Sequence, residues 1–393
     1  MAEFLPAADW TTREDIAALV AALGEGNARF VGGAVRDTLL GIAVKDLDIA
    51  TPLLPQQVIQ RLNDAGIRNV PTGIEHGTVT ALIPFGPVEI TTLRHDVSTD
   101  GRRATVAFAQ DWQEDAARRD FTINALYADP ATLEIADYFG GWDDLKVRRV
   151  RFIGDARERI REDHLRILRY FRFQARFGSL PADAESELAC AELAATLKGL
   201  SRERIGMEMM NLLSLPNPAP TVARMAELGV LAVVLPEADC QGLTALVAEE
   251  TRQQVEPDAL RRLASLLPAD ADLASLVAAR FRLSTAQKKR LMSAARRDAR
   301  QSDARALAYR LGLTQALDRL LLTGQSNAPI IGWDIPAFPL KGGQIVARGV
   351  SVGPEVARIL CAVEDRWVVE GFPDEVRVGV LLTKVLVSHK DGD

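Results

Sequence analysis

Cysteine is scarce in this chain, and its few copies follow no pattern. The 393 residues contain three cysteines, Cys190, Cys240 and Cys361, which are far apart and odd in number. No Cys-x-x-Cys spacing is present, and this argues against a disulfide framework. The cysteine usage therefore predicts a reducing, cytoplasmic setting.

Long apolar segments and histidine patterns are missing as well. No uncharged apolar run reaches the ~18 residues needed to cross a bilayer, and the N-terminal MAEFLPAADWTTRED lacks the basic start and apolar core of a signal peptide. The four histidines have no metal-ligand spacing, and no serine or cysteine nucleophile arrangement stands out. We expect no membrane association, and no feature indicates an obligate protein partner.

Charge is distributed unevenly along the chain. The whole sequence carries a net charge of −6, yet residues 141–176 contain eleven Lys and Arg against six Asp and Glu. A basic belt on an acidic protein can bind RNA phosphates, because the local field governs binding. The alternative interpretation is a solvated helix face, and charge alone does not separate the two.

Strand signals are confined to the first 140 residues, where they alternate with helix signals. A charged, glycine-containing segment over 94–118 is typical of a mobile loop. A helix over 56–65 is expected between the second and third strands. The predicted strands cover residues 29–31, 47–50, 77–83, 88–93 and 133–137.

Helical patterns dominate after residue 141, beginning with one long predicted helix over 156–177 that has an apolar stripe. A chain of 393 residues is also too long for one compact core. We therefore predict an α+β protein, with a mixed-sheet N-terminal domain followed by an all-helical remainder.

The run from Phe30 to Thr51, FVGGAVRDTLLGIAVKDLDIAT, carries the strongest functional signal. Asp46 and Asp48 are two apart on a predicted strand, so both side chains face the same way, and hard carboxylate oxygens suit Mg²⁺. Upstream, Gly32 and Gly33 permit close approach of a phosphate to a helix N-terminus. The alternatives are an ordinary turn and an exposed Asp-x-Asp dyad without a ligand.

Two further residues extend this predicted site. Arg36 lies in the first turn of the helix, where a guanidinium can grip a triphosphate bidentately. Glu89 lies on a predicted neighbouring strand, with Val88 and Ile90 facing away from it, and is a candidate third carboxylate. The alternative interpretation is that Arg36 forms a surface ion pair with Asp37.

The block RRDFTINAL at 118–126 is a second candidate. Its apolar residues would pack inward and leave the polar ones facing a cleft. Arg119 is suited to a phosphate, with Asp120 and Asn124 near a ribose. A charged helix start with an N-terminal cap would explain the same residues.

The predicted helix over 156–177 carries Asp163 and Arg166, which are three apart and therefore neighbours on one helix face. Aspartate accepts from an exocyclic amine and arginine donates to ring acceptors, so the pair can read the pairing edge of a base. Arg169 and Arg172 continue at steps of three. A chain of surface ion pairs is the alternative.

Four blocks in this order resemble the class II tRNA nucleotidyltransferases, the CCA-adding enzymes, of the DNA polymerase beta-like nucleotidyltransferase superfamily. The resemblance covers roughly residues 26–215. The blocks are GGAVRD with KDLDIAT, RRDFTINAL, REDHLRILRYFRF, and SRERIGMEM at 201–209.

The resemblance implies a nucleotidyltransferase head at 1–140, a helical neck at 141–215, a helical body at 216–330 and a helical tail at 331–393. It implies tRNA as partner, CTP and ATP as substrates, and CCA addition to the tRNA 3′ end. Residues 94–115 would be the flexible loop used for adding A. The implied roles are Gly33, Arg36 and Arg119 at the nucleotide, Asp46 and Asp48 at Mg²⁺, Asp163 and Arg166 in base selection, and Arg169 and Arg172 at further nucleotide contacts.

Two other functions stay open at this point. Bacterial poly(A) polymerases share the head, although the stretch PTGIEHGTVTAL is closer to the CCA-adding form than to their basic one. A non-catalytic RNA-binding protein with a relic site is the alternative from another class, and the intact Asp46, Asp48 and Arg36 argue against it.

Overall fold

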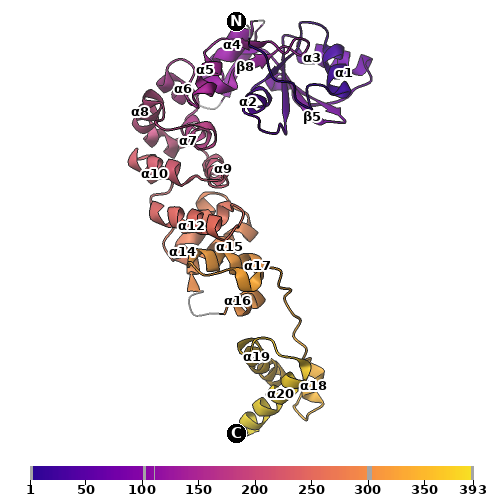
Figure 1. Cartoon of the computed structure of the whole chain (residues 1–393), viewed down its shortest axis with the longest axis vertical. Coiled ribbons are helices and arrows are strands. Elements are labelled where there is room, and N and C mark those ends of the chain that lie inside the picture. The colour runs from indigo at the N-terminus through magenta and orange to yellow at the C-terminus, as the bar shows by residue number, and fades with distance from the viewer. Residues whose placement is uncertain (1–2, 101–102, 110, 299–302, 391–393) are drawn as a thin grey trace. The chain divides into compact units, whose positions relative to one another are not determined.

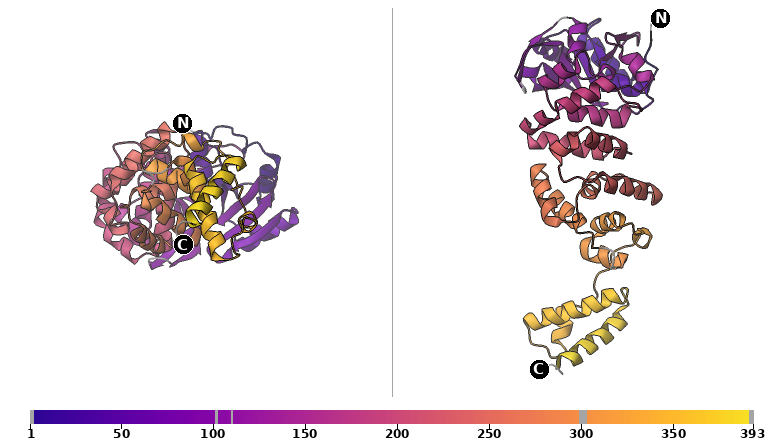
Figure 2. Two further views of the ribbon diagram at one scale, coloured as in Figure 1. Left: turned by 90° about the horizontal axis from the view of Figure 1, so that it is seen from below. Right: turned by 90° about the vertical axis from the view of Figure 1, so that its left-hand side faces the viewer.

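The computed structural model describes residues 3–100, 103–109, 111–298 and 303–390. The chain forms two compact units, Met1–Pro236 and Glu237–Asp393. The strands belong to the first unit and are drawn in indigo to purple, whereas the orange and yellow segments contain helices joined by loops (Figures 1 and 2). The predicted α+β class is confirmed.

A seven-stranded mixed sheet organises the first unit, in the order β3-β4-β5-β2-β1-β8-β9. β2 and β5 run parallel, whereas the other neighbouring pairs are antiparallel. The strands are β1 (Arg29–Val31), β2 (Leu47–Thr51), β3 (Arg68–Gly73), β4 (Thr78–Ile83), β5 (Gly86–Thr92), β8 (Leu126–Ala128) and β9 (Ile135–Asp137).

Alternation of apolar and polar residues explains the central strands. In β2, Leu47 and Ile49 are buried while Asp48 between them stays half-exposed. In β5, Val88 and Ile90 are buried and Glu89 is exposed. A strand sends successive side chains to opposite faces, so this pattern gives the sheet a core face and leaves both carboxylates on the other face.

The segment 94–118 differs from its prediction as a mobile loop. The backbone pairs as an antiparallel hairpin of β6 (Arg94–Asp100) and β7 (Arg103–Phe108), followed by α4 (Trp112–Ala117). Residues 101, 102 and 110 of the predicted loop lie outside the described residues. Threonine and valine in STDGRRATVAF favour strands. The prediction of a loop gave more weight to the high charge of the segment than to these residues.

Besides the hairpin, two strands of the seven-stranded sheet were not predicted. β3 is largely exposed and holds a proline and a glycine, so it lacks a buried face that alternation would reveal. β8 is three residues long and buried throughout, and such a short run has no visible period. Both owe their conformation to neighbours in the sheet.

Short helices complete the first unit, and aromatic rings pack the segment just before β8 against the helical region that follows. Phe121 packs against Phe173 and Phe152 with ring centroids 5.0 and 5.1 Å apart. The helices are α1 (Glu14–Leu23), α2 (Gly33–Leu39), α3 (Pro55–Asp64), α5 (Gly141–Lys146), α6 (Ala156–Glu162), α7 (Arg166–Phe177), α8 (Ala184–Glu192), α9 (Arg202–Leu213), α10 (Ala219–Glu227) and α11 (Val230–Val234).

The second unit is helical in its described part. Buried charges are paired there, as Glu250 accepts from both Arg261 and Arg262 at 2.8 Å. No helix among the described residues is long and apolar enough to cross a membrane. The helices are α12 (Cys240–Arg252), α13 (Ala259–Ser265), α14 (Ala271–Arg280), α15 (Thr285–Arg296), α16 (Ala304–Leu311), α17 (Leu313–Leu322), α18 (Gly342–Val346), α19 (Pro354–Val369) and α20 (Glu375–Lys390).

Candidate functional site

A cavity of about 470 Å³ in the first unit gathers most of the predicted residues. Six arginines and three aspartates line it, so the cavity carries an excess of positive charge that suits a polyanionic ligand. The lining residues are Gly32, Gly33, Arg36, Asp48, Arg118, Arg119, Asp120, Asn124, Asp163, Leu165, Arg166, Arg169, Phe173 and Arg204.

The Gly32–Gly33 turn forms one wall of the cavity. Gly32 precedes α2 with φ 70° and ψ −121°, a conformation that side chains rarely adopt. A Cβ built on Gly32 would lie 3.4 Å from Nη1 of Arg119 and 3.7 Å from the carbonyl oxygen of Asn124. Glycine here keeps the space beside the helix N-terminus open, as the predicted phosphate site requires.

Arg36 is held rigidly beneath this turn. Its side chain is buried, lies 4.1 Å from the ring centroid of Phe177, and donates from Nη1 to Oδ1 of Asn124. Nε donates to Asp37 at 2.8 Å. Burial lowers the pKa of Arg36, and the Asp37 carboxylate opposes that shift. The ion pair of the alternative interpretation exists, but its arginine is buried and lines the cavity.

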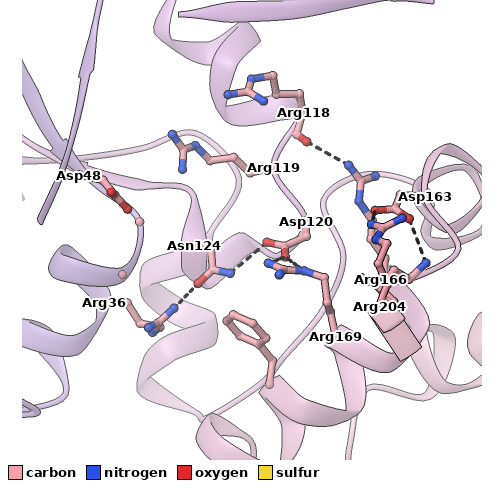
Figure 3. Close-up of a pocket in the computed structure, with 14 residues that line it drawn as sticks. Arg36, Asp48, Arg118, Arg119, Asp120, Asn124, Asp163, Arg166, Arg169 and Arg204 are labelled. Carbon is pink, nitrogen blue, oxygen red and sulfur yellow. Dashed lines mark hydrogen bonds and ion pairs between the residues drawn. The ribbon is translucent and has the colours of Figure 1, made fainter. Parts of the chain in front are cut away.

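Asp120 connects Asn124 to Arg169 along the cavity floor (Figure 3). Its Oδ1 accepts from Nδ2 of Asn124 at 2.9 Å, and its Oδ2 accepts from Nε of Arg169 at 2.9 Å. Burial alone would raise the pKa of Asp120, but Arg169 and the Asn124 hydrogen bond outweigh it and lower the pKa. Asp120 is therefore an ionised anchor for two other lining residues.

Acidic groups gather around Asp48, which lies next to Val31 in the pairing of β1 with β2 and therefore close to the Gly32–Gly33 turn. Asp48 and Glu89 face each other in the parallel register of β2 and β5. The pKa of Asp48 is raised, first by burial and then by repulsion from Glu89, and Arg119 partly offsets this. Repulsion from Asp46 raises the pKa of Asp48 by a smaller amount. Asp46 was predicted to lie on the strand, but it is exposed and lies just before β2 begins at Leu47. Neither Asp46 nor Glu89 lines the cavity.

These oxygens suit a divalent cation without forming a complete site. Crowded carboxylates that raise the pKa of one member are relieved by a cation, and oxygen donors fit Mg²⁺. Over the described ranges, no group of three or more His, Cys, Asp or Glu side chains is close enough to hold a metal alone. Substrate phosphates and water would supply the remaining ligands, as is usual for Mg²⁺.

The predicted single helix over 156–177 is wrong at Asp163. α6 ends at Glu162, Asp163 is extended with φ −149° and ψ 104°, and α7 begins at Arg166. Oδ1 of Asp163 accepts from the backbone N–H of Leu165 at 3.1 Å, and Oδ2 accepts from Arg204 at 2.7 Å. The aspartate and Arg166 thus meet at a break between helices, and not on one helix face.

Arg166 is fixed from both sides of that break. Nη1 donates to the carbonyl oxygen of Arg159 at 2.8 Å and to Glu162, and Nη2 donates to the carbonyl oxygen of Arg118 at 3.4 Å. Figure 3 shows Asp163, Arg166 and Arg204 grouped at one end of the cavity and Asp48 at the other. The two ends are therefore chemically distinct.

Arg172 lies outside the cavity lining. Its Nε donates to the buried Glu208 on α9 at 2.7 Å, and its guanidinium covers the Phe173 ring at 4.9 Å. Its predicted nucleotide contact stays a prediction.

Several residues that build the cavity were not among the predicted ones. Arg204 and Phe173 line it, and Asp115 and Tyr127 hold Arg119 from behind. Arg204 falls in SRERIGMEM, so the block was visible in the sequence although its partner was not. Asp115 lies three and four positions before Arg118 and Arg119, a spacing that the sequence displays, whereas no sequence signal places Tyr127 of β8 beside them.

Family models and curated relatives both match this chain. Residues 28–151 match the poly A polymerase head domain, and residues 182–241 match a probable RNA and SrmB-binding site of polymerase A. The mitochondrial CCA tRNA nucleotidyltransferase 1 of Mus musculus is 36% identical over 88% of this chain and 83% of its own length. The CCA-adding enzyme of Latilactobacillus sakei is 43% identical over 47% of this chain and 46% of its own length.

Solved structures show the same likeness. The Bacillus stearothermophilus CCA-adding enzyme in complex with CTP superimposes with a TM-score of 0.73 and 27% identity, over 96% of this chain and 98% of that one. The Thermotoga maritima CCA-adding enzyme, complexed with tRNA, has a TM-score of 0.67 at 20% identity and supports the fold alone.

Proposed function

The chain belongs to the family of CCA tRNA nucleotidyltransferases, and from this premise we infer that it adds CCA to tRNA 3′ ends from CTP and ATP with release of pyrophosphate. One observation supports this function most strongly. A single cavity combines a glycine turn and arginines suited to a triphosphate with an Asp163–Arg166 pair suited to the edge of a base. No covalent nucleophile is required for such a transfer.

We propose a nucleotide orientation that uses both ends of the cavity. The backbone at Gly32 and Gly33, together with Arg36 and Arg119, binds the triphosphate. Asn124 and Asp120 lie toward the ribose, and Asp163 with Arg166 reads the base without a template. Arg169, held by Asp120, and Arg172 form further contacts.

The tRNA 3′-hydroxyl then attacks the α-phosphate of the bound nucleotide. A new ester bond forms to the 3′-oxygen, the bond between the α- and β-phosphates breaks, and pyrophosphate leaves. Family members use a divalent cation, and we propose Mg²⁺ held by Asp46 and Asp48, which would lower the pKa of the hydroxyl and neutralise the departing charge. We propose that Glu89, which is beside Asp48 in the register of β2 and β5, accepts the hydroxyl proton. Most of the rate enhancement then comes from positioning and charge neutralisation.

The raised pKa of Asp48 predicts a metal-dependent acid limit of activity. Burial and Glu89 favour the protonated carboxyl, which cannot bind a cation, so lowering the pH through the raised pKa weakens metal binding. Because proton and cation compete, a tenfold rise in Mg²⁺ should move the acid limb of kcat/KM for CTP downward by up to about one pH unit. If the acid limb of kcat/KM stayed at the same pH at every Mg²⁺ concentration, Asp48 would not be a metal ligand.

Poly(A) polymerase is the second candidate, because both matching family models carry that description. Incubating the protein with tRNA lacking CCA, CTP, ATP and Mg²⁺ separates the functions at single-nucleotide resolution. We expect three added nucleotides followed by a stop. A long adenylate tail would support the polymerase, and tight tRNA binding without pyrophosphate would support the non-catalytic alternative.

We further propose that the chain divides into a head at 1–140, a neck at 141–215, a body at 216–330 and a tail at 331–393.

We also propose that the protein is cytoplasmic. Cys190, Cys240 and Cys361 form no disulfide within the described part of the chain, which supports a reducing compartment. Because relatives include mitochondrial forms, subcellular fractionation with a compartment-specific antibody tests the location.

A further inference from the structure

Asp115 joins several groups behind the cavity wall. It lies on α4 with 1% of its surface exposed. Oδ1 accepts from Nε of Arg118 at 2.9 Å, and Oδ2 accepts from Nη2 of Arg119 at 3.1 Å and from the hydroxyl of Tyr127 at 2.7 Å. One buried carboxylate thus fixes two lining arginines.

Tyr127 completes the support of Arg119. It lies buried on β8, and its hydroxyl accepts from Nε of Arg119 at 3.1 Å while donating to Asp115. The Arg119 guanidinium also lies 5.3 Å from the Tyr127 ring centroid. Two of the three guanidinium nitrogens are therefore anchored, and the third, Nη1, points toward Gly32, 3.4 Å from a Cβ built there.

The charges of this cluster are fixed over the working pH range. Burial alone would raise the pKa of Asp115, but Arg119 and Arg118 outweigh it and lower the pKa to about 2. Burial raises the pKa of Tyr127, and Arg119 only partly opposes this. Asp115 thus remains an anion and Tyr127 a neutral phenol, so the hydrogen-bond directions do not change.

We propose that Asp115 and Tyr127 are positioning residues for nucleotide binding, which hold Arg119 so that Nη1 faces the triphosphate at the Gly32–Gly33 turn. Neither residue lines the cavity, so both act through Arg119. The inference rests on the proposed function, because Arg119 must first be a triphosphate ligand. It adds two residues that the sequence blocks did not assign.

Tyr127→Phe is the cleanest variant, because it keeps the ring and removes one hydroxyl. Tyr138→Phe is a matched control, since the Tyr138 hydroxyl accepts from Arg29 at 2.8 Å and its ring packs 6.1 Å from that of Tyr127. We expect Tyr127→Phe to weaken binding of both CTP and ATP, measured by equilibrium dialysis with Mg²⁺, by about tenfold. The ratio of the two affinities stays constant, and Tyr138→Phe changes neither.

A double-mutant cycle distinguishes positioning from general loosening. When Arg119→Ala is already present, adding Tyr127→Phe should change nucleotide affinity by less than about twofold, because the effect has no arginine left to act through. Equal losses in both backgrounds, or a changed CTP to ATP ratio, would overturn the proposal. If Tyr127→Phe is unfolded at the assay temperature, Asp115→Asn enters the same cycle with the same criteria.

The two hypotheses fail differently. A wild-type protein that binds neither nucleotide and does not extend tRNA refutes the proposed function. A wild-type protein that binds and extends, with additive effects in the cycle, refutes only the positioning role.

Discussion

Asp48→Asn is expected to lower kcat for nucleotide addition by about a thousandfold, equivalent to about 4 kcal/mol of transition-state stabilisation. The substitution keeps the shape of the side chain and removes the charge that faces Glu89 across β2 and β5. A neutral amide is a poor ligand for a divalent cation, so the charge that develops on the pyrophosphate is no longer neutralised. Single-turnover extension of tRNA lacking CCA, at saturating CTP, measures the change.

Asp64→Asn provides the matched control. Asp64 ends α3 as an exposed aspartate whose hydrogen-bond partner is Gln60, so its substitution should leave the rate unchanged. Tight tRNA binding by Asp48→Asn would show that the fold is intact. A rate within tenfold of wild type would exclude Asp48 from the metal site.

Arg166→Ala is expected to reduce the discrimination between CTP and ATP at the first addition step by about a hundredfold. Arg166 is held by Arg159, Glu162 and the carbonyl oxygen of Arg118 at the end of the cavity opposite Asp48. Its loss removes donors to the base and leaves the triphosphate ligands in place. The ratio of kcat/KM for CTP and ATP on tRNA lacking CCA gives the result.

A surface arginine on the preceding helix controls for charge. Arg157 on α6 pairs with Glu192 at 2.7 Å and does not line the cavity, so Arg157→Ala should keep full discrimination. The predicted role for Arg166 fails if its variant loses affinity equally for both nucleotides and keeps their ratio.

The glycine turn and the acidic strand were predictable because local chemistry determines them. Gly32 needs a positive φ before a helix, and Asp48 alternates with two buried apolar residues in β2. Glu89 was predicted on a neighbouring strand, and the parallel register of β2 and β5 brings it beside Asp48. These features depend on periods of a few residues, which a single sequence displays.

The break at Asp163 was not predictable from the same signals. The apolar stripe continues through residues 156–177, and no glycine or proline interrupts it. Two hydrogen bonds to the Asp163 carboxylate stabilise the interruption. One comes from the backbone N–H of Leu165, and the other comes from Arg204, which is 41 positions from Asp163 in the sequence. Tertiary pairing overrides local propensity there, and it also brings Tyr127 of β8 against the local Asp115–Arg119 pair.

A crystal structure of the protein with CTP and Mn²⁺, with the metal located by its anomalous signal, tests the proposed site most directly. We predict Mn²⁺ bound by Asp48 and the triphosphate, with phosphate oxygens at the Gly32–Gly33 turn and the cytosine edge facing Asp163 and Arg166. A metal bound away from Asp48, or a cytosine at the Gly32 end of the cavity, would contradict the proposed orientation and the mechanism that depends on it.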